Sequence, residues 1–327
     1  MDWKFLDDPE NIENRNAGNG GDLVKHTVYL ALLRFFLSRQ PWRDELVLRE
    51  CHAGRGIYRI PAGDPRNRLL NCLWSDPTVG SEVLLYGAQR SVLGGLGCWR
   101  NLQNGFHWYA GSALINASAL ADNQLGSHRL ELYEWQPETR QILGSVLAAS
   151  GIERQVRVNL LSADLEDETF DGEAYVEAQI SQWGRQNVLF LDPFAMWRQP
   201  GDQRRRNRYG AIVDSLIRRG LDAPSLVLFW TWGMAFPIAE GDLDGSGAPV
   251  KNGYHELRAR LHLAGFHFIR VKWRWGLQFA MWIVVPGEHL TMLREDLDMH
   301  CSALSHHLVR QGCRESLSHP CVEVSID

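Results

Sequence analysis

Short apolar runs alternate with amphipathic segments along most of the chain. The runs are nearly continuous in β-branched, leucine and aromatic residues, which is typical of strands that are buried on both faces. They are Leu46–Cys51, Arg129–Trp135, Gln155–Leu160, Asn187–Asp192 and Ser225–Trp232. Helical spacing of apolar residues follows several of them, as in Pro137–Gly151 and Arg208–Leu221. This alternation predicts an α/β fold with a parallel sheet covered by helices.

Two regions depart from the alternation. His267–Trp275 and Gly276–Val285 read as an antiparallel pair at one edge of the sheet. Residues 60–109 carry proline, glycine and tryptophan without a clean period, although Ser81–Leu96 has helical spacing. We expect this segment to be an inserted subdomain or lid. Since no other linker is evident, we expect residues 1–327 to form a single domain.

The composition is that of a globular protein of 327 residues, with 45% hydrophobic and 22% charged residues. The N-terminal segment is acidic and lacks the basic and then apolar order of a signal peptide, and no apolar run is long enough to span a membrane. We therefore expect a cytoplasmic protein without a membrane partner. The six cysteines are scattered, so free thiols are expected.

The net charge of −5 argues against a uniformly basic nucleic-acid-binding protein but leaves room for a local basic surface. Such a segment is Arg198–Gly210, which includes Arg204, Arg205, Arg206 and Arg208. These arginines fit either contacts to nucleic-acid phosphates or a solvated loop.

Candidate ligand-binding residues follow four successive predicted strands. The first strand leads into a glycine turn, "HAGRG", His52 to Gly56, and the next three are followed by Glu134, Asp164 and Asp192. Each acid by itself also fits a helix cap or a solvated turn. Because the carboxyl ends of parallel strands meet at one edge of a sheet, the series together predicts a crevice for a nucleoside. Glu134 is suited to accept hydrogen bonds from a ribose diol.

This order of motifs resembles that of S-adenosylmethionine-dependent methyltransferases, and the chain is similar to the RlmJ family in particular. The family's opening element resembles "NAGNGGDLVKH" (Asn16–His26), and its glycine motif resembles "ECHAGRGIY" (Glu50–Tyr58). Further matches are "YAGSA" (Tyr109–Ala113), "EWQP" (Glu134–Pro137) and "DPFAM" (Asp192–Met196). The matches keep the family's order and cover most of the chain.

The resemblance implies a Rossmann-like class I methyltransferase sheet with an inserted helical subdomain. It implies S-adenosylmethionine as the cofactor and N6 of an adenine in ribosomal RNA as the target. RNA is thus favoured over DNA, although a DNA base remains an alternative. The residues implied in cofactor binding are Lys25, His26, Glu50, His52, Gly54, Gly56, Ser112, Glu134, Asp164 and Asp192.

By the same resemblance, Lys25 and His26 lie at the rim of the cofactor pocket. A lysine can pair with the cofactor's carboxylate, and a histidine is a directional donor or acceptor. The alternative interpretation is an ordinary helix start, with Asp22 as the cap and Lys25 on the solvent face. Glu50 replaces an aspartate of the family and can reach the cofactor's amino-acid end through water.

The base-recognition motif departs from the family. Asp192 and the Pro193 carbonyl correspond to the acceptors of the target amino group, but Phe194 and Ala195 replace a proline and a tyrosine. Phe194 can supply a stacking face for a flipped base or can simply pack. "LDPF" also resembles three-Cys-motif partner proteins. A non-catalytic cofactor-binding subunit with a protein partner is therefore the alternative function.

The C-terminal part of the chain contains several residue types that can bind a metal ion. Histidines and cysteines gather between His300 and Cys321. Their spacing fits no zinc finger or ribbon, and Leu290–Gly312 has the pattern of one amphipathic helix. We expect no metal site.

Overall fold

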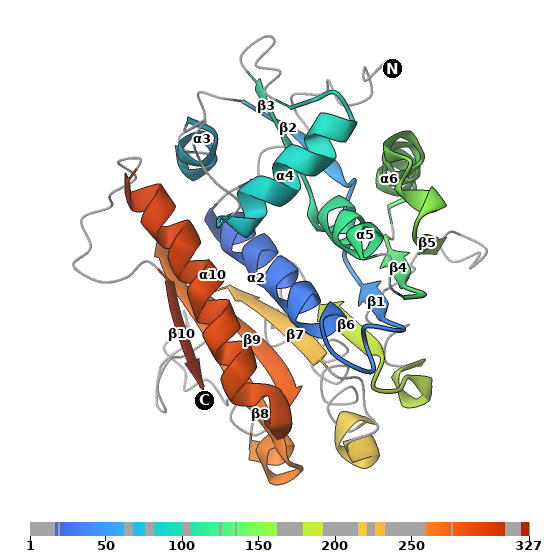
Figure 1. The fold of residues 1–327 in the computed structure, drawn as a ribbon, viewed down its shortest axis with the longest axis vertical. Helices are drawn as coiled ribbons and strands as arrows, with labels where there is room; N and C mark the ends of the chain where they lie inside the picture. Colours follow the sequence, from blue (N-terminus) through green and yellow to red (C-terminus); the bar gives the residue numbers. More distant parts are fainter. Residues whose placement is uncertain are drawn as a thin grey trace, which may run out of the picture.

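A mixed sheet of eight strands runs through the centre of the computed structural model (Figure 1). The structure describes residues 17–18, 20–61, 68–75, 82–99, 106–123, 126–134, 136–161, 179–191, 215–220, 226–232, 259–275, 277–310 and 322–326. The sheet order is β10, β8, β9, β7, β6, β1, β4, β5.

Five neighbouring strands of this sheet are parallel and confirm the α/β prediction. They are β5 (Arg157–Leu161), β4 (Arg129–Tyr133), β1 (Val47–Glu50), β6 (Asn187–Leu191) and β7 (Leu226–Trp232). The chain places β4 and β5 on one side of β1 and β6 and β7 on the other. The boundary between β1 and β6 is therefore a topological switch point, where open α/β sheets bind ligands at the carboxyl ends of their strands.

Antiparallel strands complete the other half of the sheet. Strand β9 (Leu277–Pro286) pairs with β7 and with β8 (Phe266–Trp275), so the predicted antiparallel pair is confirmed. Strand β10 (Val322–Ile326) pairs with β8 and forms the edge. The sequence pattern did not predict β10.

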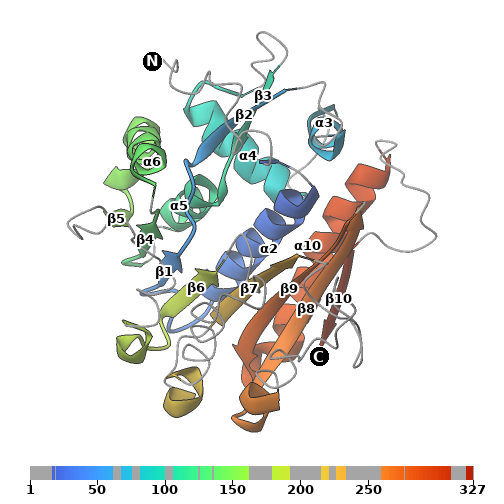
Figure 2. The same ribbon diagram turned by 180° about the vertical axis from the view of Figure 1, so that it is seen from behind.

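One face of the sheet is covered by helices that surround α2 (Gly20–Leu37), as the front and rear views show (Figures 1 and 2). Most residues of α2 are buried, as expected for a helix that is apolar almost all round. Helix α10 (Leu290–Arg310) lies along one side of α2, and α5 (Ser112–Asp122) lies against another. Other helices include α6 (Pro137–Ser150) and the short 3-10 helices Ile152–Arg154, Ile180–Gln182 and Gly287–His289.

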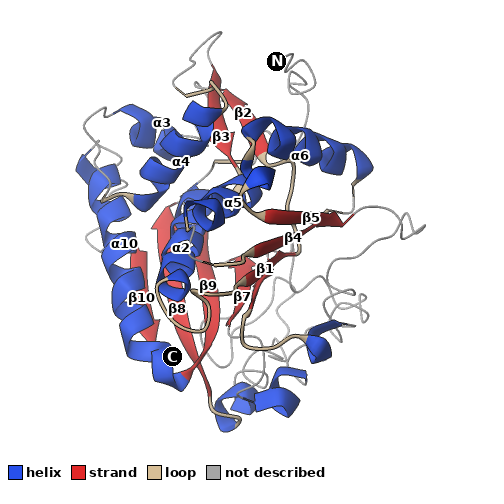
Figure 3. Ribbon diagram, turned by 45° about the vertical axis from the view of Figure 1, so that its right-hand side comes forward, coloured by secondary structure: helices blue, strands red, loops and turns tan. Residues whose placement is uncertain are grey.

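The segment expected as an insertion forms a second, two-stranded sheet beyond the carboxyl end of β1 (Figure 3). Strands β2 (Ile57–Pro61) and β3 (Phe106–Ala110) are antiparallel, with Tyr58 opposite Tyr109. Helices α3 (Arg68–Ser75) and α4 (Leu84–Gly95) lie between them in the chain. Both helices contact α2, so the described part of the segment packs on the main body. Its action as a lid stays a prediction.

One cysteine differs from the expectation of free thiols. Cys72 in α3 is disulfide-bonded, whereas Cys51, Cys98 and Cys301 are free. The expectation was wrong because wide spacing of cysteines along a chain does not keep them apart once the chain has folded. Within the described residues, no helix combines the length and the apolar character needed to cross a membrane.

Candidate functional site

The carboxyl end of β1 continues into a turn that requires glycine at two positions. Gly54 and Gly56 have φ of +63° and +77°, in the left-handed region that side chains disfavour. A Cβ on Gly54 would collide with the Tyr58 hydroxyl, and one on Gly56 would lie 2.7 Å from Leu143 Cδ1. Both glycines are thus needed for the backbone to follow this path.

The turn is tied to the strands on either side of β1. The Cys51 N–H donates to the Phe190 carbonyl of β6 at 3.0 Å, and the Ala53 N–H donates to the Tyr133 carbonyl of β4 at 3.1 Å. His52 lies between these two anchors and is half-buried. The glycine turn predicted from the sequence therefore sits at the switch point.

Glu134 follows β4 and is bound directly to this turn. The Gly54 N–H donates to Oε2 and the Gln136 N–H donates to Oε1, each at 3.0 Å. The Arg140 guanidinium donates to the Glu134 carbonyl at 2.9 Å. Backbone donors therefore fix the orientation of a carboxylate that is 8% exposed. The structure brings together two predicted site residues that are 80 positions apart.

Glu50, at the end of β1, is joined to the start of α5. Its carboxylate is 1% exposed and accepts hydrogen bonds from the Ser112 hydroxyl and from Asn116 Nδ2, the latter at 3.1 Å. The predicted residues Glu50 and Ser112 are thus in direct contact. This contact holds the start of α5 beside the glycine turn, because the Gly111 N–H donates to the Gly56 carbonyl at 2.7 Å.

The first turns of α2 carry a buried ion pair. Lys25 Nζ lies 2.9 Å from Asp22 Oδ1, and the Gly18 N–H donates to Asp22 Oδ2 at 2.8 Å. Burial alone would raise the pKa of Asp22, but the Lys25 ammonium and the Gly18 hydrogen bond lower it on balance. Lys25 is 8% exposed, so the alternative that placed it on a solvent face is wrong.

His26, beside this ion pair, is held by a residue from β3. Its Nδ1 lies 2.6 Å from the Tyr109 hydroxyl, and the two rings are nearly parallel with centroids 5.5 Å apart. Burial, and then the nearby Lys25, lower the pKa of His26 to about 3. Burial, together with Asp22 and Tyr58, raises the pKa of Tyr109 well above its ordinary value. At neutral pH the pair is therefore a neutral imidazole and a protonated phenol.

Two tyrosines join the cluster on α2 to the glycine turn. Tyr58 and Tyr109 face each other in the β2/β3 pair, so their side chains share one face. A Cβ on Gly111 would lie 2.8 Å from the Tyr58 ring, and the Tyr58 hydroxyl lies over Gly54. Tyr109 is the first residue of "YAGSA", and the sequence pattern predicts no role for it. No local signal links it to His26, which lies 83 positions away.

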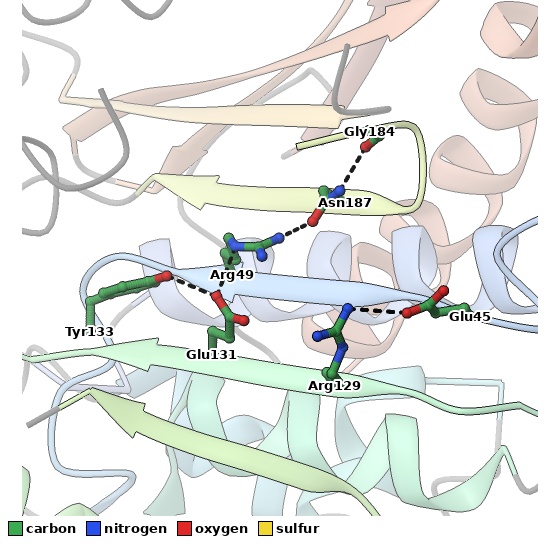
Figure 4. Close-up of polar contacts among 7 residues, drawn as sticks. All are labelled: Glu45, Arg49, Arg129, Glu131, Tyr133, Gly184 and Asn187. Carbon is green, nitrogen blue, oxygen red and sulfur yellow. Dashed lines mark hydrogen bonds and ion pairs between the residues drawn. The ribbon is translucent and has the colours of Figure 1, made fainter. Parts of the chain in front are cut away.

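A second polar network lies across strands β4, β1 and β6 (Figure 4). Arg49 of β1 lies 2.8 Å from a Glu131 oxygen of β4 and donates to the Asn187 amide oxygen of β6. The Tyr133 hydroxyl donates to the same Glu131 oxygen at 3.0 Å. The Arg49 guanidinium lies 4.0 Å from the centre of the Trp183 ring. This network connects the three strands around the switch point, and sequence reasoning did not identify it.

The remaining predicted residues lie outside the described part of the chain. They are Asp164, Asp192, Pro193, Phe194, Arg204, Arg205, Arg206 and Arg208. Strand β5 ends at Leu161 and strand β6 ends at Leu191, directly before Asp192. In the described residues, no group of three or more histidine, cysteine or acidic side chains could hold a metal ion.

Comparisons with known proteins show the fold alone. No family model matches the sequence, and no curated protein matches it. The chain is similar to the crystal structure of protein LPL1258 from Legionella pneumophila str. Philadelphia 1, described as DUF519. The TM-score is 0.56 at 17% identity, and the match covers 95% of this chain and 98% of that one. A delta-N METTL16 MTase domain is similar at a TM-score of 0.36 and 7% identity, over 80% of this chain and 82% of that one, which supports no inference.

Proposed function

We propose that the chain is an S-adenosylmethionine-dependent methyltransferase that modifies a nucleic-acid base. The target that its motifs favour, through their resemblance to the RlmJ family, is N6 of an adenine in ribosomal RNA. The strand order supports a Rossmann-like class I sheet: five parallel strands are followed by an antiparallel strand, β9, between β7 and β8. This order is typical of class I methyltransferases.

The observation that carries the proposal is the hydrogen bond between the glycine turn and Glu134. It places an oriented carboxylate and a turn without side chains together at the switch point, where such sheets bind nucleosides. A carboxylate can accept about four hydrogen bonds, so it can serve a ribose diol as well as backbone donors. His26 is neutral, and the positive charge of Lys25 is paired with Asp22. These residues therefore offer polar groups without adding an unpaired positive charge that would repel the cofactor's sulfonium.

In this proposal, the bound cofactor supplies an activated methyl group on its sulfonium sulfur. Asp192 and the Pro193 carbonyl accept the hydrogens of the target amino group, so that the nitrogen lone pair can face the methyl carbon. Phe194 stacks on the base. Orientation and electrostatic stabilisation suffice for this transfer, and no covalent intermediate with the chain is required.

The test is methyl transfer by the full chain. The protein is incubated with methyl-labelled S-adenosylmethionine and with RNA, DNA and protein made without methylation, so that acceptor sites are open. We expect label in RNA, and a decrease on the order of a hundredfold for Asp192→Asn, since a charged acceptor is lost from the transition state. Cofactor binding by Asp192→Asn should remain near that of the wild type, which separates catalysis from folding.

A non-catalytic subunit is the second candidate, and the altered base-recognition motif favours it. Phe194 and Ala195 replace a proline and a tyrosine where the family has its base-recognition motif. A wild-type chain that binds the cofactor but labels none of the three pools would support this function and would contradict the enzymatic one. Label in DNA alone would keep the reaction and change the substrate.

A further inference from the structure

We propose that Tyr109 is a positioning residue for the cofactor: it donates its hydroxyl hydrogen to His26 Nδ1 and so holds the proton of the imidazole on Nε2, which then donates to S-adenosylmethionine. This inference rests on the proposed function, because the acceptor belongs to the proposed cofactor. Tyr109 belongs to the inserted segment, and the "YAGSA" motif by itself does not indicate this role.

The geometry restricts both side chains. The hydroxyl oxygen and Nδ1 are 2.6 Å apart, which is a short and well-formed hydrogen bond. The side chain of Tyr109 is completely buried and that of His26 is 3% exposed. The planes of the two rings differ by 14°. Neither group can exchange this partner for bulk water without moving β3 away from α2.

The direction of the hydrogen bond follows from counting donors and acceptors. If Nδ1–H donated to the phenol oxygen, the Tyr109 hydroxyl hydrogen would need another acceptor. Within the described part of the chain, His26 is the hydrogen-bond partner recorded for that hydroxyl. A buried hydroxyl without an acceptor is unfavourable by about 1–3 kcal/mol. The arrangement that satisfies both groups has Tyr109 as the donor and Nδ1 as the acceptor.

A neutral imidazole that accepts at Nδ1 carries its hydrogen at Nε2. His26 is neutral at physiological pH, because burial and Lys25 disfavour its charged form. An Nε2–H group is a hydrogen-bond donor that can pair with an acceptor on a bound ligand. A carboxylate or a ribose oxygen of the cofactor is such an acceptor.

The neutral state also suits the proposed ligand. S-adenosylmethionine has a positive sulfonium, so an imidazolium close to it would repel the methyl-donating centre. The charge of Lys25 is already balanced by Asp22 at 2.9 Å. Tyr109 and His26 therefore provide a hydrogen bond at this site without adding positive charge.

The experiment reads the tautomer and the affinity separately. The side chains of histidine are labelled with nitrogen-15, and the two ring nitrogens of His26 are assigned in the full chain by comparison with His26→Gln. We expect a protonated Nε2 and an unprotonated Nδ1 in the wild type, and a mixture of tautomers in Tyr109→Phe. The affinity of Tyr109→Phe for S-adenosylhomocysteine should decrease about tenfold, the effect of one misdirected hydrogen bond.

Matched variants distinguish positioning from packing. Tyr29→Phe removes a hydroxyl from another ring beside His26, with centroids 6.1 Å apart, and leaves the Tyr109 hydrogen bond in place. It should keep both the tautomer and the affinity. His26→Gln can supply a donor near the position of Nε2 and should bind more tightly than His26→Asn, whose shorter amide lies near Nδ1.

Three results would overturn the inference: a protonated Nδ1 in the wild type, an unchanged tautomer in Tyr109→Phe, or full affinity in that variant. Thermal unfolding of each variant shows whether a loss of affinity is only a loss of structure. If the wild type binds no S-adenosylhomocysteine, the proposed function fails and the cofactor half of this inference fails with it. The nitrogen spectrum still decides the direction of the Tyr109–His26 hydrogen bond in that case.

Discussion

Lowering the pH from 7.5 to 5.0 should destabilise the folded chain through His26. The pKa of His26 is about 3 in the folded state and 6.5 as an unperturbed histidine. Below pH 6.5 the unfolded chain therefore binds a proton that the folded chain does not, so stability decreases as the pH falls. One pH unit corresponds to about 1.36 kcal/mol, and the 1.5 units from 6.5 to 5.0 give about 2 kcal/mol.

The assay is urea unfolding of the wild type and of His26→Gln at both pH values, followed by tryptophan fluorescence. Glutamine does not titrate, so the wild type should lose about 2 kcal/mol more than the variant between pH 7.5 and 5.0. Burial also lowers the pKa of His107, His128, His289 and His300, but these histidines titrate in both proteins. The lowered pKa of Asp22 contributes stability that is lost only below its ordinary value of 3.8. Equal losses in the two proteins would refute the neutral, buried state of His26.

Three further predictions concern the Arg49–Glu131 ion pair, the glycine turn and the arginines. Arg49→Met should lower the free energy of unfolding by about 3 kcal/mol, because it leaves the mostly buried Glu131 carboxylate without its cation. In urea titrations, Arg49→Met combined with Glu131→Met should recover most of this loss. A loss below about 1 kcal/mol in the single variant would show that the network is dispensable. Gly56→Ala should destabilise the protein more than Gly97→Ala. Both glycines have positive φ, but an added Cβ would lie close to Leu143 at Gly56 and would meet nothing within 4 Å at Gly97. Equal shifts in melting temperature would contradict this. Replacing three of Arg204, Arg205, Arg206 and Arg208 by alanine should flatten the salt dependence of RNA binding by about one unit of slope per lost contact, whereas an unchanged slope would assign them to a solvated loop.

Much of the sheet could be predicted because its strands are strongly patterned. The apolar runs around Leu48 and Phe190 are short, continuous and separated by helical segments, and this pattern depends only on local sequence. Strands β2, β3 and β10 were missed because their residues are mixed in polarity and contain Pro61, His107 and Glu323. Their pairing is set by the tertiary structure rather than by local propensity.

The candidate site also contains residues that the sequence could predict and contacts that it could not. Gly54 and Glu134 could be predicted, since a glycine turn and an acid at successive strand ends form a recognisable series. The link between His26 and Tyr109 could not, because it depends on the path of the inserted segment from β2 to β3. The Arg49 network was missed for a related reason. A charged residue within an apolar run gives no indication of which neighbouring strands will supply its partners.

The most direct test of the central claim is calorimetric titration of the full chain with S-adenosylhomocysteine, for the wild type and for Glu134→Gln. The account predicts one site per chain with micromolar affinity, about 8 kcal/mol, for the wild type. Glu134→Gln has nearly the same size but loses the negative charge and replaces one acceptor oxygen by an amide donor, so its affinity should decrease at least tenfold. Arg129→Gln serves as the matched control and should bind like the wild type: Arg129 is the first residue of β4, the strand that leads to Glu134, and it forms an exposed ion pair with Glu45. Absence of binding by the wild type, or equal affinity of Glu134→Gln and the wild type, would contradict the assignment of this strand edge as the cofactor site.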